Sequence, residues 1–450
     1  MAVEVAVNIG PGTPAIEATK GSKSIVQTMA LPDVKVNAER MLASFDESCQ
    51  WGSTPDGGMN RVAMNDDDKL VRDWFMEQTK KCGCSHKIDT MGNIFAIRPG
   101  INNDLAPVAL GSHLDTQPTG GKYDGILGIL CALEVLRVVH ENNIKTYAPL
   151  AIVNWADEEG ARFPQAMHGS GVWIEKYTED YGHALADRFG VTMKEELERA
   201  GYLGDVPCSY QKNPLLAHFE VHIEQGPILD QAQQAAGAVM GVQSIRWLKV
   251  TIKGRGQHTG STPMDQRKDS LLGAAKMIVE TNEIVTKKLA QLNAKATVAV
   301  IESAPQSINT IAESADFTID VRAPKDGDID DIEKMVRSTF ADIAAQHGLK
   351  IDIEVSWTQP ALVFDPTMVQ CLRESCRDKG CTIDLTSAIG HDSVNTSTRI
   401  PTAMLFTRCR DGVSHHPSEY ARPEDCVTSA EILLNAFLKY NIQVEKKYGN

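Results

Sequence analysis

The sequence first offers chemistry at His113 and Asp115, two residues that follow an apolar segment. On an extended strand, residues two apart point to the same side. The Asp115 carboxylate could therefore accept a ring proton from His113 and orient that ring as a metal ligand. The pair alone is a weak signal, because a histidine and an aspartate are common in loops, so its meaning depends on the other polar clusters.

Three carboxylates follow along the chain. Asp124 stands just after two glycines and just before an apolar segment, where it could cap a helix or bridge two metals. Glu158 and Glu159 are adjacent and follow a second apolar segment. Two neighbouring carboxylates repel each other, and a bound cation would remove that repulsion. A solvated loop would explain any one of these residues, but a metal site would explain all three.

Histidines complete the set. Residues 217–223 alternate in polarity, which predicts a strand, so His218 and His222 are not a helical pair of zinc ligands. We predict that His222 is a ligand and that His218 is structural. Near the C-terminus His415 and His416 stand together in a predicted tight turn, and either could supply a further ligand.

These residues would hold two divalent metals through nitrogen and oxygen atoms. Zinc is the expected metal, and manganese, cobalt or nickel would also fit. Bound water has a pKa near about 7, so the pair could supply a metal-bridged hydroxide at neutral pH. Whichever of Glu158 and Glu159 is not a ligand would act as general base and acid.

The elements that position these residues alternate between strand and helix. Apolar segments 106–111 and 150–155 read as strands, and residues 126–140 read as a buried helix between them. This order predicts an α/β catalytic domain whose mixed, partly parallel sheet is flanked by helices. The polar clusters then fall at the carboxyl ends of strands, where open α/β sheets place their active sites.

A second pattern begins near residue 245. Residues 247–253, 296–302, 316–321 and 350–357 read as strands, and 269–291 and 329–347 as helices. This β-α-β-β-α-β order predicts an inserted ferredoxin-like domain. We therefore expect a catalytic domain over 30–244 and 359–450, the ferredoxin-like domain over 245–358, and a loose leader over 1–29.

Composition narrows the class of protein. The 450 residues carry a formal net charge of -14, and basic residues are dispersed, which argues against nucleic-acid and anionic-membrane partners. No apolar run is long enough to span a membrane, and the first 22 residues do not have the form of a secretory signal. Ten scattered cysteines suit a reducing compartment, so a cytoplasmic location is expected.

At this point the chain resembles a known family, the dinuclear metallohydrolases of the aminoacylase and carboxypeptidase G type. More narrowly, it resembles the N-carbamoyl amino acid amidohydrolases, which include fungal and bacterial β-alanine synthase (β-ureidopropionase), N-carbamoyl-L-amino acid hydrolase and allantoate amidohydrolase. The segments that carry the resemblance are Trp51–Gly58, Gly111–Gln117, Gly121–Gly125, Glu158–Phe163, His222–Pro227, His258–Met264, Gly390–Asp392 and Gly412–His415.

The resemblance implies a role for each site residue. One metal would be held by His113, Asp124 and His222, and the other by Asp124, Glu159 and His415. Asp115 would orient His113, and Glu158 would be the general base and acid. The substrate would be bound by Gln225, His258, Asn309, Arg322 and His391. The inserted domain would act as lid and as dimerisation domain of a homodimer, with His258 and Asn309 reaching the other subunit's site.

The implied reaction is hydrolysis of the carbamoyl C–N bond of an N-carbamoyl amino acid, with N-carbamoyl-β-alanine, a pyrimidine breakdown product, as the expected substrate. The Arg322 guanidinium could clamp the substrate carboxylate through two hydrogen bonds. Two alternatives remain open, an allantoate amidohydrolase and an N-acyl amino acid deacylase or peptidase of the wider family. A non-catalytic protein of this fold would be expected to lack Glu158 or a ligand, and all are present.

Overall fold

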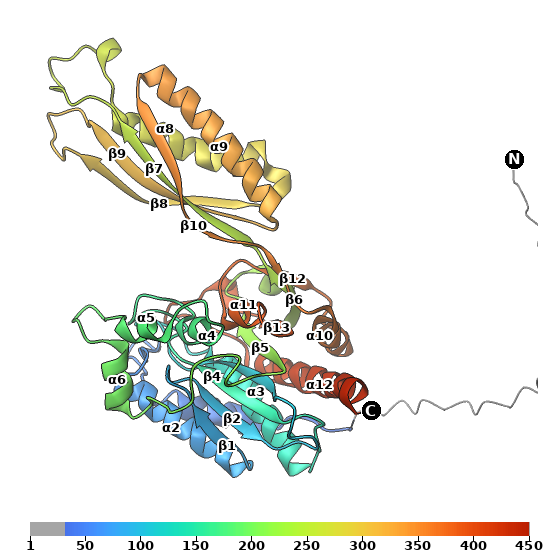
Figure 1. Ribbon diagram of the computed structural model, residues 1–450. Helices are drawn as coiled ribbons and strands as arrows, with labels where there is room; N and C mark the ends of the chain where they lie inside the picture. The colour runs from blue at the N-terminus through green and yellow to red at the C-terminus, as the bar shows by residue number, and fades with distance from the viewer. Residues whose placement is uncertain (1–31, 450) are drawn as a thin grey trace, which may run out of the picture. The chain divides into compact units, whose positions relative to one another are not determined.

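The computed structural model describes residues 32–449, shown as a ribbon in Figure 1. The expected leader over residues 1–29 lies outside the described residues. Two separate sheets organise the described chain, one with nine strands and one with four. The expected fold class, a mixed sheet flanked by helices plus an inserted ferredoxin-like domain, is confirmed.

The nine-stranded sheet has the order β1-β2-β4-β3-β5-β13-β6-β11, and β12 also pairs with β6. Four neighbouring strands at its centre, β4, β3, β5 and β13, run parallel, while β1, β2, β6 and β11 add antiparallel pairings. The strands are β1 Ser85–Ile88, β2 Ile94–Arg98, β3 Val108–His113, β4 Leu150–Trp155, β5 Ala217–Ile223, β6 Ala236–Val242, β11 Leu362–Val363, β12 Asp384–Ser387 and β13 Thr402–Thr407.

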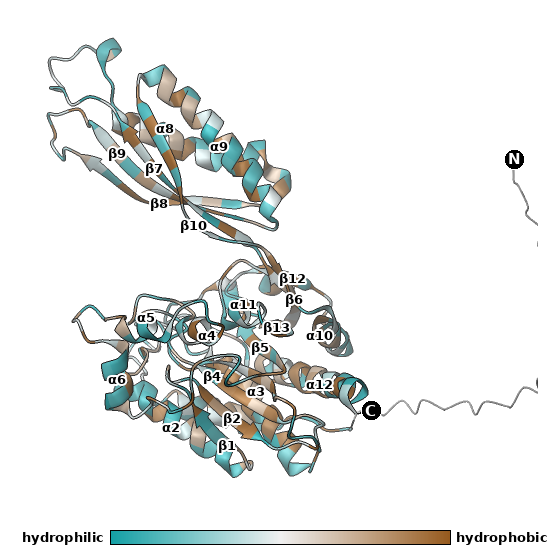
Figure 2. Cartoon of the chain, in the orientation of Figure 1, coloured by the Kyte–Doolittle hydropathy of each residue, from teal (hydrophilic) through white to brown (hydrophobic). Residues whose placement is uncertain are grey.

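Helices cover this sheet. Helix α3 packs on β3, β4 and β5, α12 packs beside it, and α10 packs on α12 and β6. The helices are α1 Ala38–Ser48, α2 Asp66–Lys81, α3 Ile126–Glu141, α4 His168–Trp173, α5 Glu179–Ala184, α6 Met193–Ala200, α7 Ile228–Gln231, α10 Pro366–Asp378, α11 Asp392–Thr396 and α12 Pro423–Tyr448. As expected from its composition, α3 is buried almost all round, and Figure 2 shows it as one of the most hydrophobic segments.

The four-stranded sheet is antiparallel with the order β10-β7-β9-β8. Its chain order is β7 Ser244–Lys253, α8 Ser270–Glu283, β8 Lys295–Ala304, β9 Ser314–Ala323, α9 Asp326–His347 and β10 Lys350–Gln359. Short π and 3-10 turns, Ile284–Lys288 and Ala290–Leu292, continue the chain after α8. The predicted apolar face, Leu248, Val250 and Ile252, is buried in a core shared with both helices. This is the β-α-β-β-α-β arrangement expected from the sequence.

Two further expectations concern the whole described chain. Within residues 32–449, none of the helices combines the length and the low polarity needed to cross a bilayer. All ten cysteines lie in this part of the chain, and none of them forms a disulfide. The sequence predicted that the cysteines do not form a disulfide scaffold, and the described residues agree with this prediction.

Candidate dinuclear metal centre

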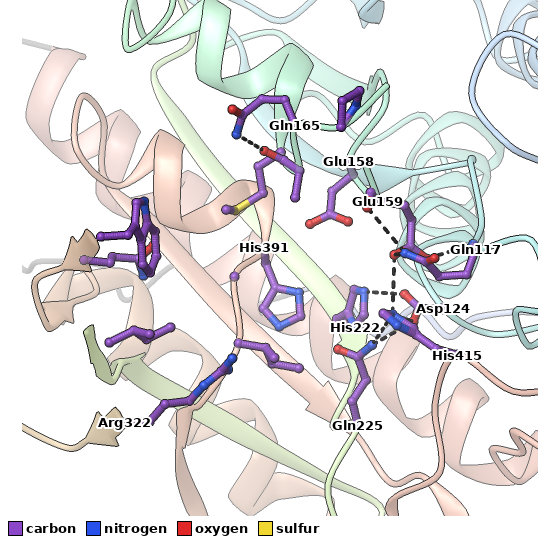
Figure 3. Close-up of a pocket in the computed structure, with 18 of the residues that line it drawn as sticks. Gln117, Asp124, Glu158, Glu159, Gln165, His222, Gln225, Arg322, His391 and His415 are labelled. Atoms are coloured by element: carbon purple, nitrogen blue, oxygen red, sulfur yellow. Dashed lines mark hydrogen bonds and ion pairs between the residues drawn. The ribbon is translucent and has the colours of Figure 1, made fainter. Parts of the chain in front are cut away.

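The carboxyl ends of the central parallel strands bring the predicted ligands together, and Asp124, Glu159, His222 and His415 are labelled in Figure 3. His113 is the last residue of β3, Glu159 follows β4, and His222 lies near the end of β5. Asp124 precedes α3, and His415 lies in the loop between β13 and α12. Because parallel strands end at the same edge of a sheet, side chains distant in sequence meet there.

Two trios of ligand atoms result. His113, Asp124 and His222 form one, and Asp124, Glu159 and His415 form the other, with the atoms of each trio within 4.8 Å of one another. Asp124 belongs to both, with Oδ1 2.9 Å from His222 Nε2 and Oδ2 3.3 Å from His415 Nε2. A carboxylate shared in this way is suited to bridge two cations.

The imidazole rings of the first trio are set for metal binding. His113 Nδ1 lies 2.9 Å from the carbonyl oxygen of Asp115, and His222 Nδ1 lies 3.0 Å from that of Ile223. A carbonyl only accepts, so each Nδ1 carries a proton, and each Nε2 is the ring nitrogen that a metal would bind. His113 Nε2 is buried and has no hydrogen-bond partner among residues 32–449. A metal ion fits that orphaned nitrogen.

The second trio settles which of two adjacent histidines is the candidate ligand. His415 adopts a left-handed backbone conformation, with φ 55°, that turns its ring to Asp124 and Glu159. His416 instead contacts Ser418 at 2.8 Å. Only His415 of the two therefore faces the cluster, and it remains about half exposed.

Asp115 supports the site differently from what the sequence predicted. Its carboxylate lies 3.8 Å from His113 Nδ1, beyond hydrogen-bond distance, and the backbone carbonyl takes the ring proton instead. The carboxylate accepts the backbone N–H groups of Glu158 and Glu159, at 3.3 and 3.2 Å. Asp115 thus holds the turn that carries both glutamates.

Close packing of backbone also shapes the cluster. Gly125 has φ 68°, and a Cβ there would come within 2.3 Å of His113 Cε1. Gly121 is just as constrained, because a Cβ would lie 2.2 Å from the carboxyl carbon of Glu419. The glycines noted beside Asp124 in the sequence are therefore required by close approach of side chains.

Carboxylates crowd this cluster and their charges interact. Burial raises the pKa of Glu158 well above its ordinary value, although nearby His113 opposes this. Burial and the adjacent Asp124 raise the pKa of Glu159 to about 7. A hydrogen bond to Asp124 raises the pKa of His415 to about 9. Such an excess of buried negative charge is what bound cations would neutralise.

Sequence reasoning missed a buried supporting group, Glu419. Its carboxylate accepts the backbone N–H groups of Tyr123 and Asp124 at 2.9 and 3.0 Å, and lies 3.1 Å from the Ser414 hydroxyl. The Ser414 hydroxyl also lies 2.9 Å from Asp124 Oδ2. Glu419 thereby ties the His415 loop to the bridging carboxylate. Its position four residues after His415 was the only sequence signal available.

The residues expected to bind substrate fall into two groups. Gln225, Arg322 and His391 line a cavity of about 540 Å³ together with four of the candidate ligands, Asp124, Glu159, His222 and His415. In Figure 3 their side chains are drawn around that cavity. His258 and Asn309 do not line it; they lie close together on the smaller sheet's loops, where Thr259 N donates to Asn309 O at 3.0 Å. His258 is exposed.

Each residue of the first group has a defined setting. Gln225 Nε2 donates to Asp124 Oδ2 at 2.7 Å. Arg322 is paired with Asp320 at 2.8 Å and donates to the carbonyl of Ala388 at 2.5 Å. Burial lowers the pKa of His391 well below its usual value, so its ring is neutral, and its Nε2 has no partner in the described part of the chain.

His218 behaves as the structural residue that the sequence predicted. It is fully buried on β5, and its Nδ1 contacts the Thr396 hydroxyl at 3.2 Å. Burial lowers the pKa of His218 to about 4. It belongs to neither trio of ligand atoms.

Comparisons with known proteins agree with this geometry. The pattern of peptidase family M20/M25/M40 matches residues 109–439. An N-carbamoyl-L-amino-acid amidohydrolase of Rhizobium meliloti is 36% identical over 406 residues, covering 90% of this chain and 97% of that protein. A ureidoglycolate hydrolase of Arabidopsis thaliana is 28% identical, covering 91% and 88%. A solved amidase of the hydantoinase/carbamoylase family from Burkholderia multivorans has a TM-score of 0.84 at 41% identity, covering 90% and 98%.

Proposed function

The chain belongs to peptidase family M20/M25/M40, and from that premise we propose that it hydrolyses the carbamoyl C–N bond of N-carbamoyl amino acids. The products are the amino acid, carbon dioxide and ammonia. The observation that carries this proposal is that Arg322 and Glu158, whose carboxylate belongs to neither trio, line one cavity with four of the five candidate ligands.

Two divalent ions, when bound by the trios, would polarise the carbamoyl oxygen and lower the pKa of water. The Glu158 carboxylate takes a proton from the attacking water and passes it to the leaving nitrogen as the C–N bond breaks. The carbamate that remains loses carbon dioxide and frees the second amine.

Other residues bind and orient the substrate. His391 is neutral and its buried Nε2 can donate a hydrogen bond to the developing oxyanion. The Arg322 guanidinium would bind the amino acid carboxylate. These donors matter because a carbamoyl carbon, which receives electrons from two nitrogens, is a poor electrophile.

Within this class of substrates, N-carbamoyl-β-alanine is the one expected from the sequence, and an N-carbamoyl α-amino acid is the second candidate. The relative from Rhizobium meliloti is named for N-carbamoyl-L-amino acids, and several apolar side chains line the cavity. Ammonia release from both types, and from allantoate and ureidoglycolate, should be assayed with metal-depleted protein and after adding zinc, manganese, cobalt or nickel. Metal-dependent turnover of an N-carbamoyl amino acid supports the proposal, and cleavage of N-acetyl amino acids or dipeptides alone contradicts it.

We propose in addition that the protein is a homodimer formed through the four-stranded sheet. Strand β8 is an edge of that sheet, and its Val300 and Ile301 are 59% and 44% exposed. On the neighbouring helix α8, Leu272 and Val279 are 44% and 60% exposed. An exposed apolar edge strand invites pairing with a second chain. Light scattering coupled to size exclusion should give twice the monomer mass, and a monomer mass at micromolar concentration would refute the dimer.

The exposed pair His258 and Asn309 would then act on the other subunit's cavity. Co-expression of a Glu158→Gln chain with a His258→Ala chain tests this. In the mixed dimer one site has an intact Glu158 and receives an intact His258, so about a quarter of wild-type activity should return on equal mixing. If His258 acts within its own chain, the mixture will be no more active than its better parent.

A further inference from the structure

A pair of tryptophans lies on the face of the four-stranded sheet that the helices leave uncovered. Along β7, Leu248, Val250 and Ile252 point into the core beneath α8 and α9. Side chains alternate along a strand, so Trp247 points to the opposite face. It is 40% exposed, which is a large apolar surface to leave open to water.

A bulge in β10 places Trp357 beside it. Ile353 pairs with Val250 and Val355 pairs with Leu248, both on the core side. The next pair is Trp357 with Trp247, because the register shifts by one residue at Ser356. Simple alternation would have placed Trp357 beneath the helices. Bulges re-aim side chains in this way, and they recur beside active sites.

The two indole rings form a contiguous aromatic surface. Their centroids are 4.9 Å apart, and their planes are inclined by 40°. Rings at this separation attract each other and present one joined apolar wall. Both residues line the cavity that contains the metal-binding side chains.

The aromatic surface lies next to the group that would bind the substrate carboxylate. Trp247 pairs across the sheet with Asp320, and Asp320 holds the Arg322 guanidinium through Nη2 at 2.8 Å. Arg322 itself pairs with Ile245, two residues from Trp247. The guanidinium and the aromatic pair therefore share one sheet face, at a spacing fixed by neighbouring strands.

The rest of the cavity is larger and more apolar than a small unbranched substrate needs. Met167, Ile245 and Ile389 line it as well, and its volume is about 540 Å³. Clefts of roughly 300–1,000 Å³ accommodate ligands of drug size. N-carbamoyl-β-alanine has no substituent beside its carboxylate and would leave this wall in contact with water.

We propose that Trp247 and Trp357 form a side-chain subsite that selects N-carbamoyl α-amino acids with a large aromatic side chain. This inference rests on the proposed function and refines its substrate class. With the carboxylate on Arg322, a substituent on the adjacent α-carbon reaches the indole pair. The subsite thus favours the α-amino acid over the β-alanine derivative.

The test compares kcat/KM for the N-carbamoyl derivatives of L-phenylalanine, L-tryptophan, glycine and β-alanine. The aromatic derivatives should exceed the glycine derivative on the order of 100-fold. Trp357→Ala should lower kcat/KM for the aromatic derivatives about tenfold more than for the glycine derivative, and Trp357→Phe should recover most of that loss. Phe189→Ala, which removes an exposed aromatic side chain outside the cavity, is the matched control and should leave both values unchanged.

The possible outcomes test the proposed subsite and the proposed reaction separately. Equal turnover of all four derivatives would overturn the subsite and leave the proposed function standing. Absence of turnover on every derivative would overturn the function, and the subsite would then be judged by binding. Quenching of tryptophan fluorescence in Glu158→Gln protein should show tighter binding of N-carbamoyl-L-phenylalanine than of N-carbamoylglycine. Equal affinities, or a preference that survives Trp357→Ala, would refute the subsite by that route.

Discussion

The candidate metal cluster and the uncovered face of the small sheet are built in opposite ways. In the cluster, Asp124 and His222 are almost fully buried, and their polar atoms are held by neighbouring backbone and side chains. On the sheet face, Trp247 is substantially exposed, and within residues 32–449 the Arg322 guanidinium is bound by Asp320 and a single carbonyl. Metal ligation requires fixed geometry before the metal binds, whereas a substrate-binding face can be completed by the substrate itself.

A bridging carboxylate should be the most sensitive residue of the cluster. Asp124→Ala removes a ligand from both trios and leaves His113 and His222 without their shared partner. We expect loss of both metals and a fall in activity greater than the roughly 10²–10⁴-fold that a general base contributes. Elemental analysis of purified protein measures the metals, and Asp104→Ala, at an exposed loop position, is the control. Two metals retained by the Asp124 variant would exclude its bridging role.

Substitution of the proposed general base, Glu158, should lower the rate of catalysis without removing the metals. Glu158→Gln keeps the shape of the side chain but cannot accept the proton from water. We expect kcat to fall by about 10²–10⁴-fold while two metals remain bound. Single-turnover ammonia release together with elemental analysis measures both quantities. A variant with near-normal kcat would transfer the role of base to another group, such as Glu159.

Substitution of Arg322 on the sheet face should change the KM for substrate and leave the metal content unchanged. Arg322→Ala should raise KM for N-carbamoyl amino acids by about 10- to 100-fold, as expected when a charged hydrogen bond to the substrate is lost. Arg322→Lys should give an intermediate value because it keeps the charge but loses the paired geometry. Arg337→Ala, on an exposed part of α9, is the control. An unchanged KM would show that the carboxylate binds elsewhere.

Two buried histidines should each reduce the stability of the larger domain in acid. Burial lowers the pKa of His218 and of His168 to about 4, below the unfolded value near 6.5. Between pH 6.5 and pH 4 these histidines are protonated in the unfolded chain but not in the folded chain. Their contribution to the free energy of unfolding is therefore complete above pH 6.5 and falls as the pH drops toward 4. The cost is about 2 kcal/mol per histidine at pH 5.

Neither histidine of the small sheet's segment, His258 or His347, is buried. Calorimetry at pH 7 and pH 5 should show a smaller fall in the larger domain's transition temperature for His218→Asn than for the unchanged protein, because carboxylates with a raised pKa, such as Glu159, are common to both proteins. An equal fall in both proteins would contradict this account.

Much of the cluster could be predicted from the sequence because strand ends follow directly from patterns of apolar residues. The apolar segment before His113 and the alternation around His222 identified both strands correctly. Choosing His415 over His416, and assigning the His113 proton to a backbone carbonyl, depended on backbone conformation that no pattern records. Glu419 was missed because it reaches Asp124 across almost 300 residues of chain.

The sheet face was harder to predict for a different reason. Trp357 continues the odd-numbered series Ile351, Ile353 and Val355, so alternation assigns it to the core. The bulge at Ser356 reverses that assignment, and a bulge depends on how two strands pair and not on the residues of one strand.

That bulge has an evolutionary consequence. A point mutation changes one contact, whereas the bulge sets the face of every residue that follows it in β10. Regular pairing at unchanged length would set Trp357 opposite Arg246 and turn Trp357 and Gln359 toward the helices. Deletion of the extra residue, Ser356, would instead place Trp357 directly after Val355 and keep it opposite Trp247. Relatives that lack this one residue are therefore expected to keep the same cavity lining on a regular strand.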